Sequence, residues 1–210
     1  MKFDINKILE KLANNNYPLF VSERHLQVAF IIEANKMYPN YEYLPEYVYC
    51  ENGIDYHIDL LVCDGNKESI AVEFKYVVAG GVINVPGDKN YALRNHSAID
   101  IRRHQCIRDI GRLETYVKSK SLNCNKGYFI LITNMPRFWL GSSNTSIAAQ
   151  FDIPDKTVLK KGIHKPIGDS RFTDEYEPLK IDNDYLIEYK KYKEVDGKNG
   201  SFKSLCIEVK

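Results

Sequence analysis

The chain has 210 residues, of which 44% are hydrophobic, 12% aromatic and 27% charged, and its net charge is +1. This composition is typical of a folded globular protein and argues against a largely disordered chain. A net charge so close to zero excludes the overall positive field of a nucleic-acid coat protein, so a polyanionic partner would have to meet a local patch.

We expect a single cytoplasmic domain over residues 1–210, with a core at 18–134 and a C-terminal elaboration at 135–210. No Pro/Ser-rich linker or charge run divides the sequence. The five cysteines are odd in number, widely spaced and never form a CxxC motif, which argues against a disulfide framework or a zinc knuckle. Residues 1–16 lack the apolar core of an export signal, and no run of eighteen apolar residues occurs, so we predict no membrane span.

Two helices are expected in the first forty residues. Residues 4–14 fit a short helix that ends at an Asn run. In the second helix the apolar side chains recur at spacings of four, four and three, at Leu26, Phe30, Ala34 and Met37. This period is typical of an amphipathic helix, and Pro39 ends it.

Three strands follow, in segments that are rich in Val, Ile and Tyr. Their sequences are EYVYC, DYHIDLLVC and SIAVEFKYVV. Asn52-Gly53 and Asp64-Gly65 between them are residues of tight hairpin turns, which predicts an antiparallel three-strand meander.

The second half of the chain predicts a loop, a helix, a buried strand and a tail of β structure. Residues 77–95 are glycine-rich without a clear period and are expected to form a long loop. Ser97 and Asp100 fit a capping box at the start of a helix of about twenty residues. Residues 127–134 are a continuous apolar run, typical of a strand that is buried on both faces and parallel to an earlier strand. A β-hairpin is expected in the tail, whereas residues 135–180 show no clear pattern.

This order of elements predicts an α/β protein with a mixed central β-sheet flanked by helices.

Charged residues interrupt two of the predicted strands. Because alternate side chains of a strand share a face, Glu73 and Lys75 lie on one side, and a tight turn would bring Asp59 beside Glu73. Two adjacent carboxylates require a cation, and hard oxygen ligands suit Mg²⁺ or Mn²⁺. Lys75 could then orient a water molecule or stabilise charge on a phosphate, as in a phosphodiester-cleaving site.

Asp59, thirteen intervening residues and Glu73-Phe74-Lys75 in an apolar strand resemble the PD-(D/E)XK nuclease superfamily. The resemblance covers residues 18–134, and Ile58 stands where the family name has Pro. It implies a restriction-endonuclease-like αβββαβ core and Mg²⁺-dependent hydrolysis of nucleic acid, with DNA a better candidate than RNA. The metal ligands would be Asp59 and Glu73.

The resemblance also implies further residues around the site. Glu23 lies on the buried stripe of its helix and corresponds to an acidic residue that many members place near the metal. In the later helix, a polar stripe of Arg102, Gln105, Asp109 and Arg112 brings Gln105 or Arg102 toward the site. Lys89 and Arg94, in the preceding loop, could contact a phosphate backbone.

Several alternatives stay open at this stage. Glu73 and Lys75 could form an ordinary ion pair on a solvated strand face, and Asp55 is a rival for Asp59. Glu23 could simply favour the positive end of its helix, and the polar stripe could be a solvated face in which Asp109 pairs with an arginine. The alternative function is a catalytically silent nuclease-fold protein that binds nucleic acid or acts as a scaffold. A homodimer is compatible with the near-neutral charge.

Overall fold

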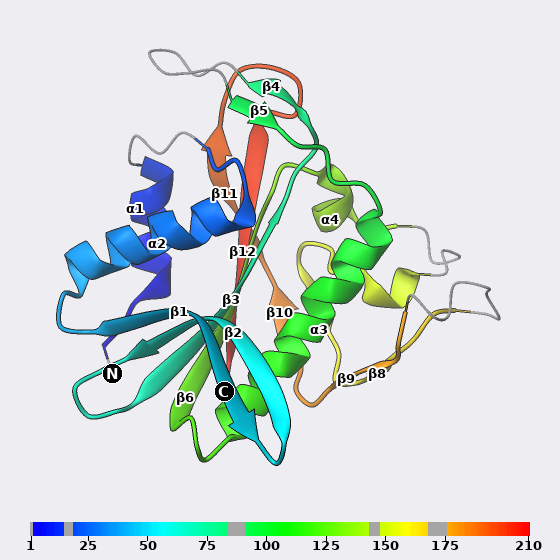
Figure 1. Cartoon of the computed structure of the whole chain (residues 1–210). Helices are drawn as coiled ribbons and strands as arrows, with labels where there is room; N and C mark the ends of the chain where they lie inside the picture. Colours follow the sequence, from blue (N-terminus) through cyan, green and yellow to red (C-terminus); the bar gives the residue numbers. More distant parts are fainter. Residues whose placement is uncertain (1, 15–18, 84–90, 143–147, 168–175) are drawn as a thin grey trace.

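The computed structural model describes residues 2–14, 19–83, 91–142, 148–167 and 176–210. A mixed six-stranded sheet lies at its centre, in the order β1-β2-β3-β6-β12-β11 (Figure 1). These strands are β1 (Glu42–Glu51), β2 (Ile54–Cys63), β3 (Ser69–Val77), β6 (Cys124–Thr133), β12 (Ser201–Val209) and β11 (Tyr189–Glu194). The expected α/β class with a mixed central sheet is confirmed.

The first three strands form the expected antiparallel meander, because β1 pairs with β2 and β2 pairs with β3. At the turn between β1 and β2, Asn52 and Gly53 both have positive φ angles, 55° and 77°, which suits a tight hairpin. Strand β6 is parallel to β3, and the helix α3 (Ile99–Lys118) lies between them in the chain. The buried parallel strand is therefore confirmed.

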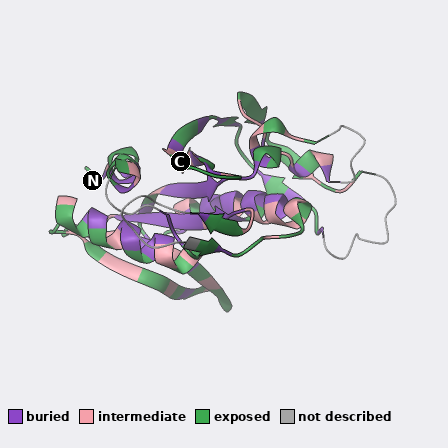
Figure 2. Ribbon diagram, turned by 90° about the horizontal axis from the view of Figure 1, so that it is seen from above, coloured by how far each residue is buried: buried purple, intermediate pink, exposed green. Residues whose placement is uncertain are grey.

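Helices cover both faces of the sheet. Figure 1 shows α1 (Ile5–Asn14) and α2 (Glu23–Met37) on one side of the central strands and α3 on the other. Phe30 of α2 packs on Phe74 of β3, with ring centroids 5.2 Å apart. On the opposite face, Cys106 and Ile110 of α3 are fully buried. Figure 2 shows that buried residues gather along the sheet and on the helix sides that face it.

Two local expectations are wrong in the segment between β3 and α3. The capping box of Ser97 and Asp100 is not formed; Ala98 is the N-cap residue, in the left-handed region with φ 55°, and no side chain caps the helix. The backbone N–H of His96 is bound to Val78, which holds the chain against β3 until just before the helix begins. The expected loop also contains a short hairpin of β4 (Gly81–Ile83) and β5 (Tyr91–Leu93), too short to show a strand pattern.

The C-terminal part adds small elements around α3 and extends the sheet. The small elements are α4 (Pro136–Leu140), the 3₁₀ helix η1 (Ala149–Phe151), β7 (Thr157–Leu159), β8 (Gly162–His164), β9 (Leu179–Ile181) and β10 (Tyr185–Ile187). The expected hairpin is confirmed as β11 and β12, and β12 pairs with β6. Across the described residues, no helix combines the length and apolar character needed to cross a membrane.

Glu114 attaches this C-terminal part to α3. The side chain is buried and accepts hydrogen bonds from the backbone N–H groups of Asp182 and Asn183, at 2.8 and 3.0 Å. It also accepts hydrogen bonds from the side-chain amide of Asn183 and from the hydroxyl of Tyr185, at 3.0 and 2.7 Å. One carboxylate of α3 thus fixes the position of the segment before β10.

Candidate functional site

The candidate site lies where β2 and β3 separate. Their antiparallel register runs from the Cys63/Ser69 pair to the Leu60/Val72 pair. Beyond the Leu60/Val72 pair, the backbone N–H groups of β3 donate to side chains instead of to the neighbouring strand. The N–H of Phe74 donates to Asp59 Oδ2 at 2.7 Å, and the N–H of Tyr76 donates to Glu23 Oε2 at 3.0 Å.

His96 continues the same pattern, because its Nδ1 accepts from the N–H of Val78 at 3.0 Å. The open edge of β3 is therefore satisfied by three side chains from three different segments. This arrangement draws Asp59 from β2 and Glu23 from α2 to the same stretch of β3. Glu23 points toward the sheet, as its position on the buried stripe of α2 predicts.

Glu73 lies on the α3 side of β3 and is fully buried, with 0% of its surface exposed. Among the residues that the structure describes, neither of its carboxylate oxygens has a hydrogen-bond partner. Its nearest ion pair joins Oε1 to a guanidinium nitrogen of Arg112 at 3.4 Å. The alternative of a solvated strand face is therefore wrong for Glu73.

Lys75 is held by contacts with two carboxylates and a carbonyl. Its Nζ lies 2.8 Å from Asp109 Oδ2 and 3.7 Å from Glu23 Oε1, and it donates to the carbonyl of Phe74 at 3.1 Å. The side chain of Lys75 is only 14% exposed. Lys75 and Glu73 face the same side of β3 but are bound to different partners.

Asp109 and Arg112 of α3 connect Glu73 to Lys75. Arg112 lies 3.3 Å from Asp109 Oδ1, donates to the Tyr116 hydroxyl at 2.9 Å and donates to the backbone carbonyl of His57. Exposed Arg108 reaches Asp109 only at 4.0 Å. The result is a chain of alternating charges that runs Glu73, Arg112, Asp109, Lys75, Glu23.

Sequence reasoning identified Asp109 and Arg112 as part of a polar stripe but did not place them in the site. The expected ion pair between them is present, but Asp109 is buried rather than solvated, with 1% of its side chain exposed. A signal was available in the sequence. Asp109 lies three residues after Cys106 and four before Leu113, so it falls on the apolar face of α3, where a charged residue needs a buried partner.

The carboxylates outnumber the cations that they contact. Burial raises the pKa of Asp59 to about 6, and the negative charges of Glu23 and Asp109 act in the same direction, against the N–H of Phe74 and the charge of Lys75. Burial, followed by the charges of Asp59 and Asp109, raises the pKa of Glu73 well above its usual range despite Arg112. The charged forms of both carboxyls are therefore disfavoured in the site, and a bound cation would favour them.

Lys75 stays protonated in this environment. Burial alone would lower its pKa, but the carboxylates of Asp109 and Glu23 outweigh burial and raise it. Lys75 is consequently an ammonium donor at neutral pH.

Two carboxylates of this site are of the kind that a hydrated divalent cation uses. Within the described parts of the chain, no group of three or more His, Cys, Asp and Glu side chains has the geometry to hold a metal by itself. Mg²⁺ and similar ions keep several waters and use only one or two carboxylates in phosphate-processing sites. Asp59 and the hydrogen-bond-free oxygens of Glu73 could supply those two carboxylates.

A cleft of about 340 Å³ opens beside Lys75. Its walls include Glu23, Arg94, Arg102 and Gln105. Arg102 donates to Gln105 Oε1 at 3.0 Å, so these two predicted residues face the cleft as a pair. Lys89, the other predicted nucleic-acid contact, lies outside the described residues.

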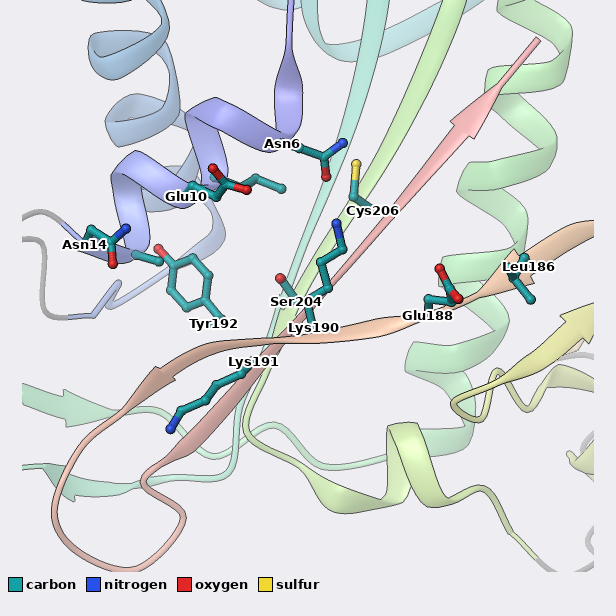
Figure 3. A pocket seen from close by; sticks show the side chains of 12 residues that line it. Asn6, Glu10, Asn14, Leu186, Glu188, Lys190, Lys191, Tyr192, Ser204 and Cys206 are labelled. Carbon is teal, nitrogen blue, oxygen red and sulfur yellow. The ribbon is translucent and has the colours of Figure 1, made fainter.

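Two other features lie away from the site. Asp55 is exposed and sits opposite Cys50, near the turn at the far end of β2, so it does not replace Asp59. A second cleft, of about 300 Å³, lies between α1 and the β11–β12 hairpin and contains none of the predicted site residues. Figure 3 shows Asn6 and Glu10 of α1, with Cys206 and Tyr192, among the side chains that line this second cleft.

The candidate site thus combines side chains from four elements, the consecutive strands β2 and β3 and the helices α2 and α3. Glu23 comes from α2, Asp59 from β2 and Glu73 with Lys75 from β3, while α3 contributes the Asp109–Arg112 ion pair. Comparison with protein-family models, with curated proteins and with solved structures finds no match for this chain.

Proposed function

We propose that the protein is a metal-dependent nuclease that hydrolyses phosphodiester bonds, with DNA a better candidate substrate than RNA. The observation that supports this function is the position of Asp59, Glu73 and Lys75 at the point where β2 and β3 separate. The order α2-β1-β2-β3-α3-β6, in which the short β4–β5 hairpin is inserted before α3, also supports the restriction-endonuclease-like core that the sequence resemblance implies. The preference for DNA comes from that resemblance.

Asp59 and Glu73 would hold Mg²⁺ or Mn²⁺. When bound, such an ion stabilises negative charge on a phosphate and lowers the pKa of a coordinated water. Asp59 would keep its hydrogen bond from Phe74, which fixes one carboxylate oxygen and leaves the other for the ion.

Lys75 acts as a positioned donor in this proposal. Because its pKa is raised, it carries a proton at neutral pH, which favours a role as a donor over a role as the base that activates water. Its ammonium can instead donate a hydrogen bond to the attacking water or to a phosphate oxygen that gains charge. Asp109 and the carbonyl of Phe74 hold the ammonium in place.

The first test compares cleavage by wild type and by Lys75→Ala. Plasmid DNA, single-stranded DNA and RNA are incubated with Mg²⁺ or Mn²⁺. Loss of a positioned donor to developing charge typically lowers a rate by about 100-fold or more, so the variant should lose nearly all cutting. Lys36→Ala is the matched control, because Lys36 lies at the far end of α2 and is 59% exposed.

Equal metal-dependent cutting by wild type and Lys75→Ala would rule out this role for Lys75. Cutting that survives in EDTA would rule out the metal. If neither protein cuts any of the three substrates, the nuclease proposal fails.

One observation favours a second candidate, a nuclease-fold protein that binds nucleic acid without cutting it. Arg112 already places a positive charge 3.4 Å from Glu73, where a metal ion would otherwise be expected. A protein of this kind would bind DNA equally well in EDTA and in Mg²⁺ and would cut under neither condition. Binding by wild type without cutting, in the experiment above, would therefore favour it.

A further inference from the structure

Two guanidinium groups at the cleft beside Lys75 are not neutralised by any carboxylate of the described residues. Arg94 is exposed and has no ion pair there, and Arg102 donates only to the side-chain carbonyl of Gln105. By contrast, Arg103 and Arg112 each form an ion pair with a carboxylate.

The two arginines reach the cleft from different elements. Arg94 follows β5, and Arg102 lies in the first turn of α3. His96 lies on the same wall, and its pKa is lowered, first by burial and further by the charges of Arg102 and Arg94. Both arginines line the same cleft and could act on one bound group there.

Among the described residues that line the cleft, Glu23 is the one carboxylate, against the three cationic side chains of Lys75, Arg94 and Arg102. One oxygen of Glu23 accepts the N–H of Tyr76, and the other lies 3.7 Å from Lys75. An external anion in the cleft would therefore meet more positive than negative charge. Guanidinium groups recognise phosphate through paired, charge-assisted hydrogen bonds.

The size of the cleft limits what can enter it. A volume of about 340 Å³ lies at the small end of the range for small-molecule sites, roughly 300–1,000 Å³. A group of the size of a single nucleotide suits this space better than a whole duplex.

We propose that this cleft binds a second phosphate of the substrate strand, held by Arg94 and Arg102, next to the phosphate that faces Lys75; this inference rests on the proposed nuclease function. The second phosphate is either an internal phosphodiester or a terminal phosphomonoester. Two guanidinium groups match the double charge of a terminal phosphomonoester, which would make strand ends the preferred substrate.

Binding in EDTA tests this site without cleavage. Fluorescence anisotropy is measured with three labelled oligonucleotides of one sequence, which carry a 5′-phosphate, a 3′-phosphate or no terminal phosphate. Each titration is repeated over a series of salt concentrations. The variants are Arg94→Gln, Arg102→Gln and the double variant. Lys36→Gln removes the same charge at a distance from the cleft, and thermal melting checks that every variant is folded.

Each arginine variant should weaken binding by about tenfold or more and reduce the salt slope by about one, while Lys36→Gln should match wild type. If the loss is confined to one phosphorylated end, the site holds a terminal phosphomonoester. If the loss is the same for all three oligonucleotides, it holds an internal phosphodiester.

The inference is overturned if the double variant binds with the affinity and salt slope of Lys36→Gln, or if wild type does not bind at all. Failure of the nuclease proposal alone would look different. The arginine variants would lose binding as expected, but wild type would not cut any substrate in Mg²⁺ or Mn²⁺.

Discussion

Protonation of the single residue Asp59 should change the free energy of unfolding by a measurable amount. Its pKa rises from an ordinary value of 3.8 to about 6 on folding. An acid with a raised pKa in the folded state favours folding when protonated, so this contribution is present below pH 4 and is lost as the pH rises through 6. In EDTA, Asp59→Asn should therefore lose less stability than wild type between pH 4 and pH 7, by at most about 3 kcal/mol.

Urea unfolding at several pH values measures this difference. Asn keeps an acceptor for the N–H of Phe74, so the hydrogen bond itself is not the variable. An identical pH dependence in wild type and Asp59→Asn would contradict the raised pKa.

For some of the site residues, the sequence alone was enough to predict that they lie together. Asp59, Glu73 and Lys75 could be brought together from strand alternation alone, because the two strands are adjacent in the chain. Asp109 and Arg112 could not be assigned in the same way. Their contacts depend on how α3 lies across β3, which a helical period does not determine.

At the scale of the elements, the open edge of β3 depends on acceptors from other segments. Glu23→Ala would leave the buried N–H of Tyr76 without its partner, which typically costs about 1–3 kcal/mol. Glu23→Gln keeps an acceptor oxygen and should retain most of the stability. Urea denaturation of the three proteins tests this order.

Cleavage assays of the same variants separate structure from chemistry. If Glu23 assists the proposed metal, Glu23→Gln should be folded and yet cut more slowly than wild type. If Glu23 only favours the positive end of α2, Glu23→Ala and Glu23→Gln should lose similar, small amounts of stability. That second result would contradict the role of Glu23 at β3.

The long elements were predictable because each carries many residues of one pattern. Examples are α2, with its apolar stripe, and β6, with its continuous apolar run. The short strands β7 to β10 have three residues each, and no period can be recognised in so few. The start of α3 was misjudged because the helix begins after a left-handed turn at Ala98, two residues beyond a tertiary hydrogen bond from His96 to Val78, and a local capping pattern shows neither feature.

For the whole molecule, Glu114 is the residue that joins the C-terminal part to the site-bearing helix. Glu114→Ala removes four hydrogen bonds, and of the donors that it leaves without this acceptor the Tyr185 hydroxyl is buried, so we expect a loss of about 1–3 kcal/mol. Limited proteolysis should then cut more readily around residues 180–187. Glu188→Ala, at an exposed position nearby, is the control and should resemble wild type.

Unchanged stability and proteolysis of Glu114→Ala would mean that other contacts hold the C-terminal part in place. The sequence gives no indication of this attachment. Glu114 looks like an ordinary helical glutamate, and its partners lie 68 to 71 residues further along the chain.

The pairing of β12 with β6 has a consequence for the order of events during protein synthesis. The apolar segment 127–133 leaves the ribosome long before residues 201–209, which cover its outer edge in the folded sheet. During that interval the nascent chain presents an unpaired, aggregation-prone strand edge. Protection of this edge while translation continues would therefore fall to chaperones or to a temporary pairing within the nascent chain.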